Sequence, residues 1–184
     1  MNSIIKDAKE RMDKSVEAFR SDIAKIRTGK ATTALLDGIR VDYYGSQSPL
    51  SQVSNVSVLD AHTLSITPWD KSMVPTIEKA IMTSDLGLNP ASDGTNIRLP
   101  IPPLTEERRK EMVKLVKKFG EDAKIAVRNI RRDANDQLKK QEKEKELSED
   151  QRHDAENQVQ ELTDKHIKKI DEIVEHKEAE IMEV

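Results

Sequence analysis

The sequence predicts an α+β protein: a long antiparallel three-helix bundle into which a small, mostly β, α/β domain is inserted. Apolar residues recur at steps of three and four in both terminal parts of the chain, whereas they alternate with polar residues in the middle. All seven prolines and all glycines but Gly120 lie between residues 28 and 103. Charged residues make up 35% of the chain and aromatic residues 3%, which favours solvated helices over a β-sandwich.

Residues 3 to 27 are expected to form the first helix. Charges separate its apolar positions, and Gly29 follows as a stop signal. The apolar stripe comprises Ile5, Ala8, Met12, Phe19, Ile23 and Ile26.

The middle of the chain, residues 30–104, is expected to form the inserted domain. Ile39, Val41 and Tyr43 alternate with polar or exposed positions, as in a half-buried strand. A turn is predicted around Asp60 and another at Asp93-Gly94. The further strands are predicted at 56–58, 64–66 and 97–101, and a helix at 72–84.

Two long helices are expected after Leu104. Thr105 is suited to cap the first of them, and Ser148 with Gln151 forms a capping-box pattern at the start of the second. The middle helix is about 60 Å long and the first helix only about 37 Å at 1.5 Å per residue. The charged segment 141–152 is therefore predicted to be a bare two-helix tip. The stripes are Met112, Val116, Phe119, Ala123, Val127, Ile130, Ala134 and Leu138, then Ala155, Val159, Leu162, Ile170, Val174 and Ile181.

The first helix is too short to be stable alone, and its partners lie beyond residue 104. We therefore assign residues 1–29 and 105–184 to the bundle and residues 30–104 to the inserted domain. Two links join them, and domains joined in this way move unless a large apolar interface holds them. The predicted hinge consists of Gly29, Lys30, Pro102 and Pro103.

Charge is unevenly distributed in this protein of net charge −3. Residues 105–140 contain twelve basic and seven acidic residues, a net charge of +5, whereas residues 141–184 contain seven and fifteen, a net charge of −8. A turn of about 100° per residue places most of the cations of the middle helix on one side and most of its acids on another flank. We call these cations the basic band: Lys110, Lys117, Lys124, Arg128, Arg131, Arg132 and Lys139.

The basic band has two interpretations. It is the solvated face of an amphipathic helix, or it binds phosphates. Arginine at positions 128, 131 and 132 favours the second interpretation, because guanidinium groups match phosphate oxygens. The scarcity of aromatic residues argues against stacking on single-stranded bases and for contact with folded RNA.

Other functional classes have little support in the sequence. The absence of cysteine excludes disulfides, thiol catalysis and Cys-ligated metals. His62, His153, His166 and His176 are scattered without metal-ligand spacing, and His166 is expected to be packed or at the surface. We see no catalytic constellation, signal peptide or membrane span, and so expect a cytoplasmic monomer, not an enzyme, that has no cofactor and binds no metal or membrane.

Four strings carry a resemblance to a known family. They are LLDGIRVDYYG, DLGLNP, IRLPIPPLTEERRKEMVK and AVRNIRRDAND, in this order. With these strings the chain resembles the bacterial ribosome recycling factors over essentially its whole length. The resemblance implies an L-shaped arrangement of a three-helix bundle and an inserted domain.

The resemblance also implies a function. Such factors bind the post-termination 70S ribosome and, with elongation factor G and the GTP that this partner hydrolyses, split the subunits and release mRNA and tRNA. The bundle would lie on large-subunit ribosomal RNA, with Arg128, Arg131 and Arg132 as chief contacts, and the inserted domain would face elongation factor G. The complete set of expected RNA contacts is Arg109, Lys110, Lys117, Lys124, Arg128, Arg131 and Arg132.

The main alternative is a helical scaffold or chaperone hairpin, for which the basic band would be incidental. It predicts self-association and no salt-dependent binding to ribosomes. An enzyme is the third interpretation.

Overall fold

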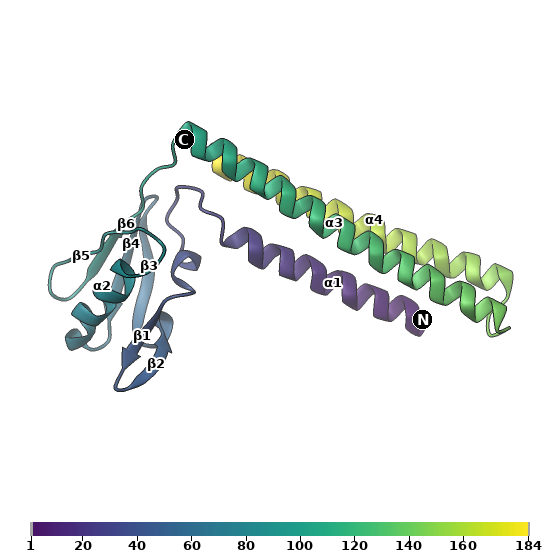
Figure 1. The fold of residues 1–184 in the computed structure, drawn as a ribbon, viewed down its shortest axis with the longest axis horizontal. Helices are drawn as coiled ribbons and strands as arrows, with labels where there is room; N and C mark the ends of the chain where they lie inside the picture. The colour runs from purple at the N-terminus through teal and green to yellow at the C-terminus, as the bar shows by residue number, and fades with distance from the viewer. Residues whose placement is uncertain (1, 184) are drawn as a thin grey trace. The chain divides into compact units, whose positions relative to one another are not determined.

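The computed structural model describes residues 2–183, which fold into two compact units. Unit 1 comprises residues up to Ile26 together with the chain from Lys110 onward, and unit 2 comprises Arg27–Arg109. The helix-rich unit 1 and the antiparallel sheets of unit 2 confirm the predicted α+β class. Figure 1 shows the elements of both units.

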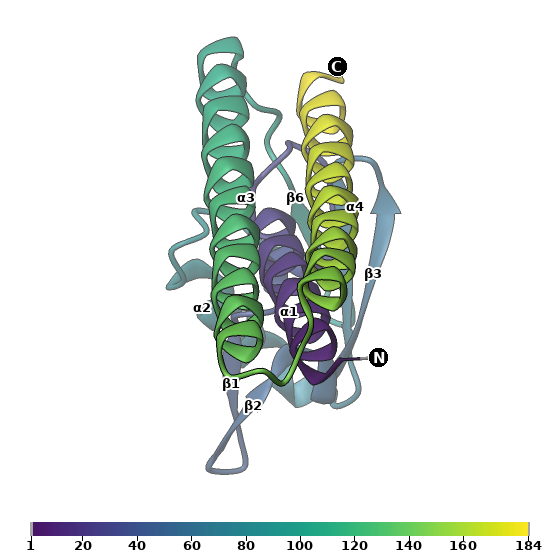
Figure 2. The same cartoon turned by 90° about the vertical axis from the view of Figure 1, so that its right-hand side faces the viewer.

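Unit 1 is a bundle of the three long helices α1 (Ser3–Ala24), α3 (Glu106–Lys143, from Lys110 onward) and α4 (Glu149–Met182), which lie side by side in Figure 2. α1 runs antiparallel to α3, because Asn2 contacts Gln141 while Arg11 contacts Asp133. α3 and α4 are also antiparallel, because Lys124 contacts Asp171 while Arg131 contacts Gln160. The predicted stripes supply most of the bundle core.

The predicted caps of the long helices are present. The Ser148 hydroxyl accepts a hydrogen bond from the Gln151 backbone N–H at 3.1 Å, and the Gln151 side chain accepts one from the Ser148 N–H at 2.9 Å. The Thr105 hydroxyl accepts a hydrogen bond from the Arg108 N–H at 3.1 Å. These side chains satisfy backbone donors that a helix start leaves free, and so fix where α3 and α4 begin.

The structure corrects one expectation about the bundle and narrows another. α1 ends at Ala24 and not at residue 27, because the Ile26 N–H turns back to the Ile23 carbonyl while Ile26 stays buried and continues the apolar pattern. The predicted bare tip at 141–152 is shorter by its first residue, because the Asn2 amide donates to the Gln141 side chain at 3.4 Å. α1 therefore reaches the level of Gln141, in the last turn of α3, and the α3–α4 hairpin continues beyond the start of α1 (Figure 1).

His166 is packed inside the bundle, as expected, with 7% of its surface exposed. Its Nδ1 lies 2.6 Å from the Leu162 carbonyl oxygen, and its Nε2 lies 2.7 Å from a carboxylate oxygen of Asp13 on α1. The ring thus contacts an oxygen atom at each of its two nitrogens and joins α4 to α1. The hydrogen bond from His166 and a second one from Lys9 lower the pKa of Asp13.

Unit 2 contains two antiparallel sheets and one α-helix. β1 (Arg40–Tyr43) and β2 (Ser46–Pro49) form a hairpin. The second sheet has the order β3-β4-β6-β5, and α2 (Val74–Met82) follows a 3-10 turn. The strands of this sheet are β3 (Ser54–Asp60), β4 (Thr63–Pro68), β5 (Ala91–Ser92) and β6 (Ile97–Pro100), and the 3-10 helices are Thr33–Leu36, Leu50–Gln52 and Lys71–Met73.

The core of unit 2 is aliphatic. β4 contributes Leu64 and Ile66 to this core, and α2 contributes Ile77 and Ile81. All four side chains are fully buried. The predicted strands and helix are present with shifted ends, whereas β2 and β5 were not expected. The inward positions expected for Tyr43 and Met82 are wrong, because their side chains are exposed.

Candidate nucleic-acid interface

The predicted RNA contacts lie along α3, where helical spacing sets one beside the next. Arg109 falls at the end of unit 2 and the remaining six residues fall in unit 1. Lys110, Lys117 and Arg132 are exposed, whereas Arg109, Lys124, Arg128 and Arg131 are half-buried. The structure therefore presents the basic band as a continuous face of α3 whose inner edge borders α4.

Arg128 and Arg132 keep their charges uncompensated. Within residues 2–183, neither guanidinium has a hydrogen-bond or ion-pair partner, and the same holds for the Lys117 ammonium. A guanidinium offers five donors that water satisfies until an anion replaces it. These side chains therefore leave their full charge and donors for a ligand.

Arg131 is only weakly engaged. One of its terminal nitrogens donates to the Gln160 side-chain oxygen of α4 at 3.4 Å, a long contact with a neutral acceptor. The Gln160 amide in turn donates to Asp164 at 2.9 Å. This contact orients the guanidinium without neutralising it.

Lys124 differs from the other members of the basic band. Its ammonium lies 2.6 Å from an Asp171 carboxylate oxygen on α4 and 3.1 Å from Glu121, and only 17% of its side chain is exposed. The hydrogen bond to Asp171 raises the Lys124 pKa. Its charge is therefore already compensated within the bundle, which sequence spacing alone does not reveal.

The acidic flank of α3 has a partner of its own. Asp133 accepts a hydrogen bond from Arg11 of α1 at 3.1 Å. This ion pair explains part of the sorting of charges around α3, because the flank that carries Asp133 faces α1. The basic band lies on a different side of α3 from the flank that faces α1.

The predicted hinge residues lie in unit 2, where one turn holds both incoming and outgoing chain segments. The Ala31 N–H donates to the Ala61 carbonyl at 2.7 Å, and the Ile101 N–H donates to the His62 carbonyl at 2.7 Å. The His62 ring nitrogen Nδ1 donates to the Gly29 carbonyl at 2.9 Å. The sequence analysis missed this role of His62, because its two partners are distant in the chain.

The backbone conformation at position 29 requires a glycine. Its φ is +79°, and a Cβ at this position would lie 3.1 Å from the Leu104 backbone nitrogen. Any other L-residue would be strained there and would press on the outgoing segment. Pro102 and Pro103, which precede Leu104, are exposed.

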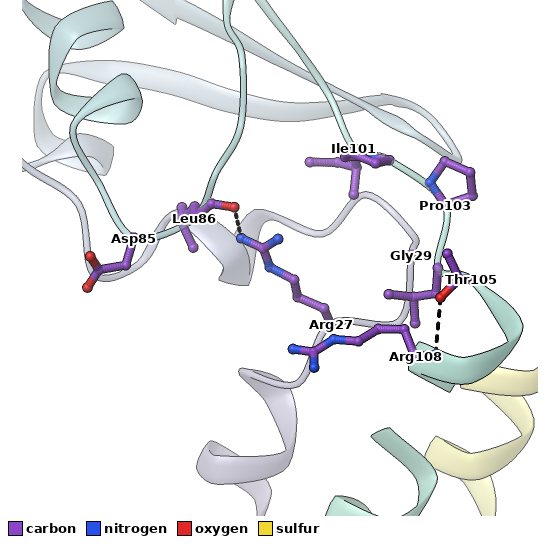
Figure 3. A pocket seen from close by; sticks show the side chains of 10 residues that line it. Arg27, Gly29, Asp85, Leu86, Ile101, Pro103, Thr105 and Arg108 are labelled. Carbon is purple, nitrogen blue, oxygen red and sulfur yellow. Dashed lines mark hydrogen bonds between the residues drawn. The ribbon is translucent and has the colours of Figure 1, made fainter. Parts of the chain in front are cut away.

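A cavity of about 600 Å³ in unit 2 adjoins these segments. Figure 3 shows the Arg27 and Arg108 side chains beside it and Arg27 donating to the Leu86 carbonyl. Arg27 therefore attaches the start of unit 2 to the loop after α2. Arg27 was also absent from the predicted site residues.

Two kinds of site are absent from residues 2–183. No cluster of three His, Cys, Asp or Glu side chains in this range could hold a metal ion. None of its helices combines the length and apolarity that crossing a membrane requires.

Comparisons with known proteins agree with this architecture. Residues 19–182 match the family model described as ribosome recycling factor. Ribosome-recycling factors of Burkholderia mallei and Burkholderia pseudomallei are 58% identical over 181 residues, which cover 98% of this chain and 97% of theirs.

Two solved structures are also similar. A solution structure of the ribosome recycling factor has a TM-score of 0.80 and 45% identity, and the match covers 98% of this chain and 96% of that one. The second is a model of the T. thermophilus factor, bound with E. coli elongation factor G to the E. coli post-termination complex. Its TM-score is 0.68 at 45% identity, with 98% and 97% covered.

Proposed function

This chain belongs to the ribosome recycling factor family, and on that premise we propose that it disassembles the post-termination ribosome together with elongation factor G. The subunits separate, and mRNA and tRNA leave. The protein contributes binding and positioning, whereas GTP is bound and hydrolysed by elongation factor G. A factor that acts on the ribosome in this way works in the cytoplasm as a monomer.

The observation that carries the proposal is the uncompensated charge on α3. Arg128 and Arg132 have no partner within residues 2–183, and Arg131 meets only a neutral side chain. Guanidinium groups at this spacing match the phosphates of folded large-subunit ribosomal RNA. The remaining proposed contacts, Arg109, Lys110, Lys117 and Lys124, extend the same face along the helix.

The proposed contacts should contribute unequally to RNA affinity, because some of the cations are already paired within the protein. Lys124 must leave or share Asp171 before it can meet a phosphate, so it contributes less than Arg132. Arg128 and Arg132 lose only water when they bind. RNA affinity should therefore depend most on the residues of the AVRNIRRDAND string.

The second part of the proposal is a hinge at Gly29, Lys30, Pro102 and Pro103. Two links of this kind permit motion between domains. Gly29 gives the incoming link a backbone conformation that other residues avoid, and the two prolines stiffen the outgoing link. We infer that bundle binding anchors the factor while the other unit moves.

The proposed function is tested with reconstituted post-termination 70S complexes. Light scattering should fall, as subunits part, only when this protein, elongation factor G and GTP are all present. Scattering that stays constant with all three present, while an authentic recycling factor splits the same complexes, would contradict the proposal.

A further inference from the structure

The aromatic residues of unit 2 lie outside its hydrophobic core. Its core is aliphatic, whereas Tyr43, Tyr44 and Trp69 are 37%, 79% and 63% exposed. The two phenylalanines of the chain lie in the bundle, so these three are the remaining aromatic residues of the protein. Exposed tyrosine and tryptophan are the residues that contribute most to protein–protein binding.

The structure holds Tyr44 in a strained conformation. Tyr44 and Gly45 connect β1 to β2 with φ angles of +51° and +84°, as in a two-residue type I′ turn. Asparagine is common at the first of these positions, whereas a tyrosine there is unfavourable. Strain of this kind concentrates at functional sites.

Further contacts orient the Tyr44 ring. Its hydroxyl donates to the Asp70 carboxylate at 2.8 Å, and the Tyr43 ring meets it edge-on with centroids 4.6 Å apart. Asp70, the residue after Trp69, also accepts from the Ser72 hydroxyl and N–H, which lower its pKa. Asp42 accepts from the Gly45 N–H at 2.9 Å. Two carboxylates thus accompany the aromatic side chains.

We propose that Tyr44, Trp69, Asp42 and Asp70 form a docking surface for a protein that presents arginine or lysine side chains. Cations bind favourably over aromatic rings and beside carboxylates. The same carboxylates repel phosphate groups, so a nucleic-acid backbone fits this surface poorly. We call these four residues the aromatic patch.

The position of the aromatic patch suits the proposed hinge. His62 precedes β4 and holds both chain links, whereas Trp69 follows β4 at its opposite end. Six residues of strand span about 20 Å. A partner that pushes on the patch therefore acts on the end of unit 2 farthest from its links, where a given force gives the greatest rotation.

This inference rests on the proposed function, and one experiment tests both separately. The variants are Tyr44→Asn, which suits the turn, and Tyr44→Asn with Trp69→Ala. Val58→Ala removes an apolar side chain that is 51% exposed near the other end of β4, and is the matched control. Circular dichroism and thermal unfolding check that each variant is folded.

We expect the double variant to split post-termination 70S complexes at least about tenfold more slowly with elongation factor G and GTP, as for the loss of hot-spot residues. Large-subunit binding should stay within about twofold of wild type, and Val58→Ala should split normally. Splitting by the double variant at the wild-type rate would overturn the inference, while failure of the wild type would overturn the proposed function.

A photo-crosslinking phenylalanine at position 44, in the same reconstituted complexes, identifies the partner. The inference expects a crosslink to a protein segment that contains arginine or lysine. Crosslinks to ribosomal RNA alone, or none in complexes that split, would contradict it.

Discussion

Gly120 of α3 permits close packing against α4, and its replacement by alanine should destabilise the bundle. A Cβ at this position would lie 2.6 Å from Cγ2 of Val174. Non-bonded carbon atoms prefer separations of about 3.5–4.0 Å, so the added methyl group is about 1 Å too close. Val174 cannot avoid it by rotation, because a β-branched side chain in a helix has one strongly preferred χ1 rotamer.

Two opposing effects determine how much Gly120→Ala changes the free energy of unfolding. Alanine in place of glycine inside a helix stabilises by about 1 kcal/mol. Overpacking in a core costs about 1–3 kcal/mol. Gly120→Ala should therefore lower the free energy of unfolding by about 1 kcal/mol, although an unpacked helix would gain stability from the same change.

The assay is urea denaturation followed by the helical circular dichroism signal, in wild type, Gly120→Ala, Val174→Ala and the double variant. Val174→Ala removes the methyl group that causes the overlap. In that background Gly120→Ala should stabilise, by up to about 1 kcal/mol. If Gly120→Ala stabilises the chain equally in both backgrounds, the close approach of α3 and α4 at this point is refuted.

Three further predictions concern single side chains. Hydrogen bonds from His166 and Lys9 lower the pKa of the Asp13 carboxyl group below its ordinary 3.8. The ionised carboxylate therefore stabilises the folded protein fully above pH 3.8, and this contribution is lost as the pH falls through the lowered pKa. In urea denaturation, Asp13→Asn should therefore cost about 1 kcal/mol at pH 7, allowing for its half-exposed side chain, and less at pH 2. Lys124→Ala should lower bundle stability by about 1 kcal/mol while changing large-subunit affinity less than Arg132→Ala does; the reverse order in denaturation and sedimentation assays would contradict the role assigned to Asp171. Gly29→Ala should slow subunit splitting and leave large-subunit binding intact, whereas Gly87→Ala, with φ +65° and open space around it, should split normally; equal splitting rates would argue against the hinge.

Much of the fold follows from local patterns in the sequence. The stripe from Met112 to Leu138 predicts the buried face of α3, and Ser148 with Gln151 predicts the start of α4. β2, of sequence SQSP, has no apolar alternation, and it pairs because the Tyr44-Gly45 turn returns the chain along β1. Such a strand is specified by its partner and not by its own residues.

The candidate site was predictable in outline only. Helical spacing places the basic band on one side of α3, but it does not tell which cations are already paired. Lys124 meets Asp171, 47 residues away, because of the register between α3 and α4. His62 likewise forms hydrogen bonds with Gly29 and Ile101, which are far from it in the chain and are brought to it by the tertiary fold.

The central claim is that uncompensated arginines of α3 bind ribosomal RNA phosphates, and the salt dependence of large-subunit binding tests it most directly. If about five phosphates are contacted, log affinity should fall with log salt at a slope of roughly −4. In Arg128→Ala/Arg132→Ala the slope should weaken by roughly 1.5–2, whereas Lys118→Ala/Lys140→Ala, with equal loss of charge outside the basic band, should keep the wild-type slope. A wild-type slope near zero, or the same weakening in both double variants, would contradict the account.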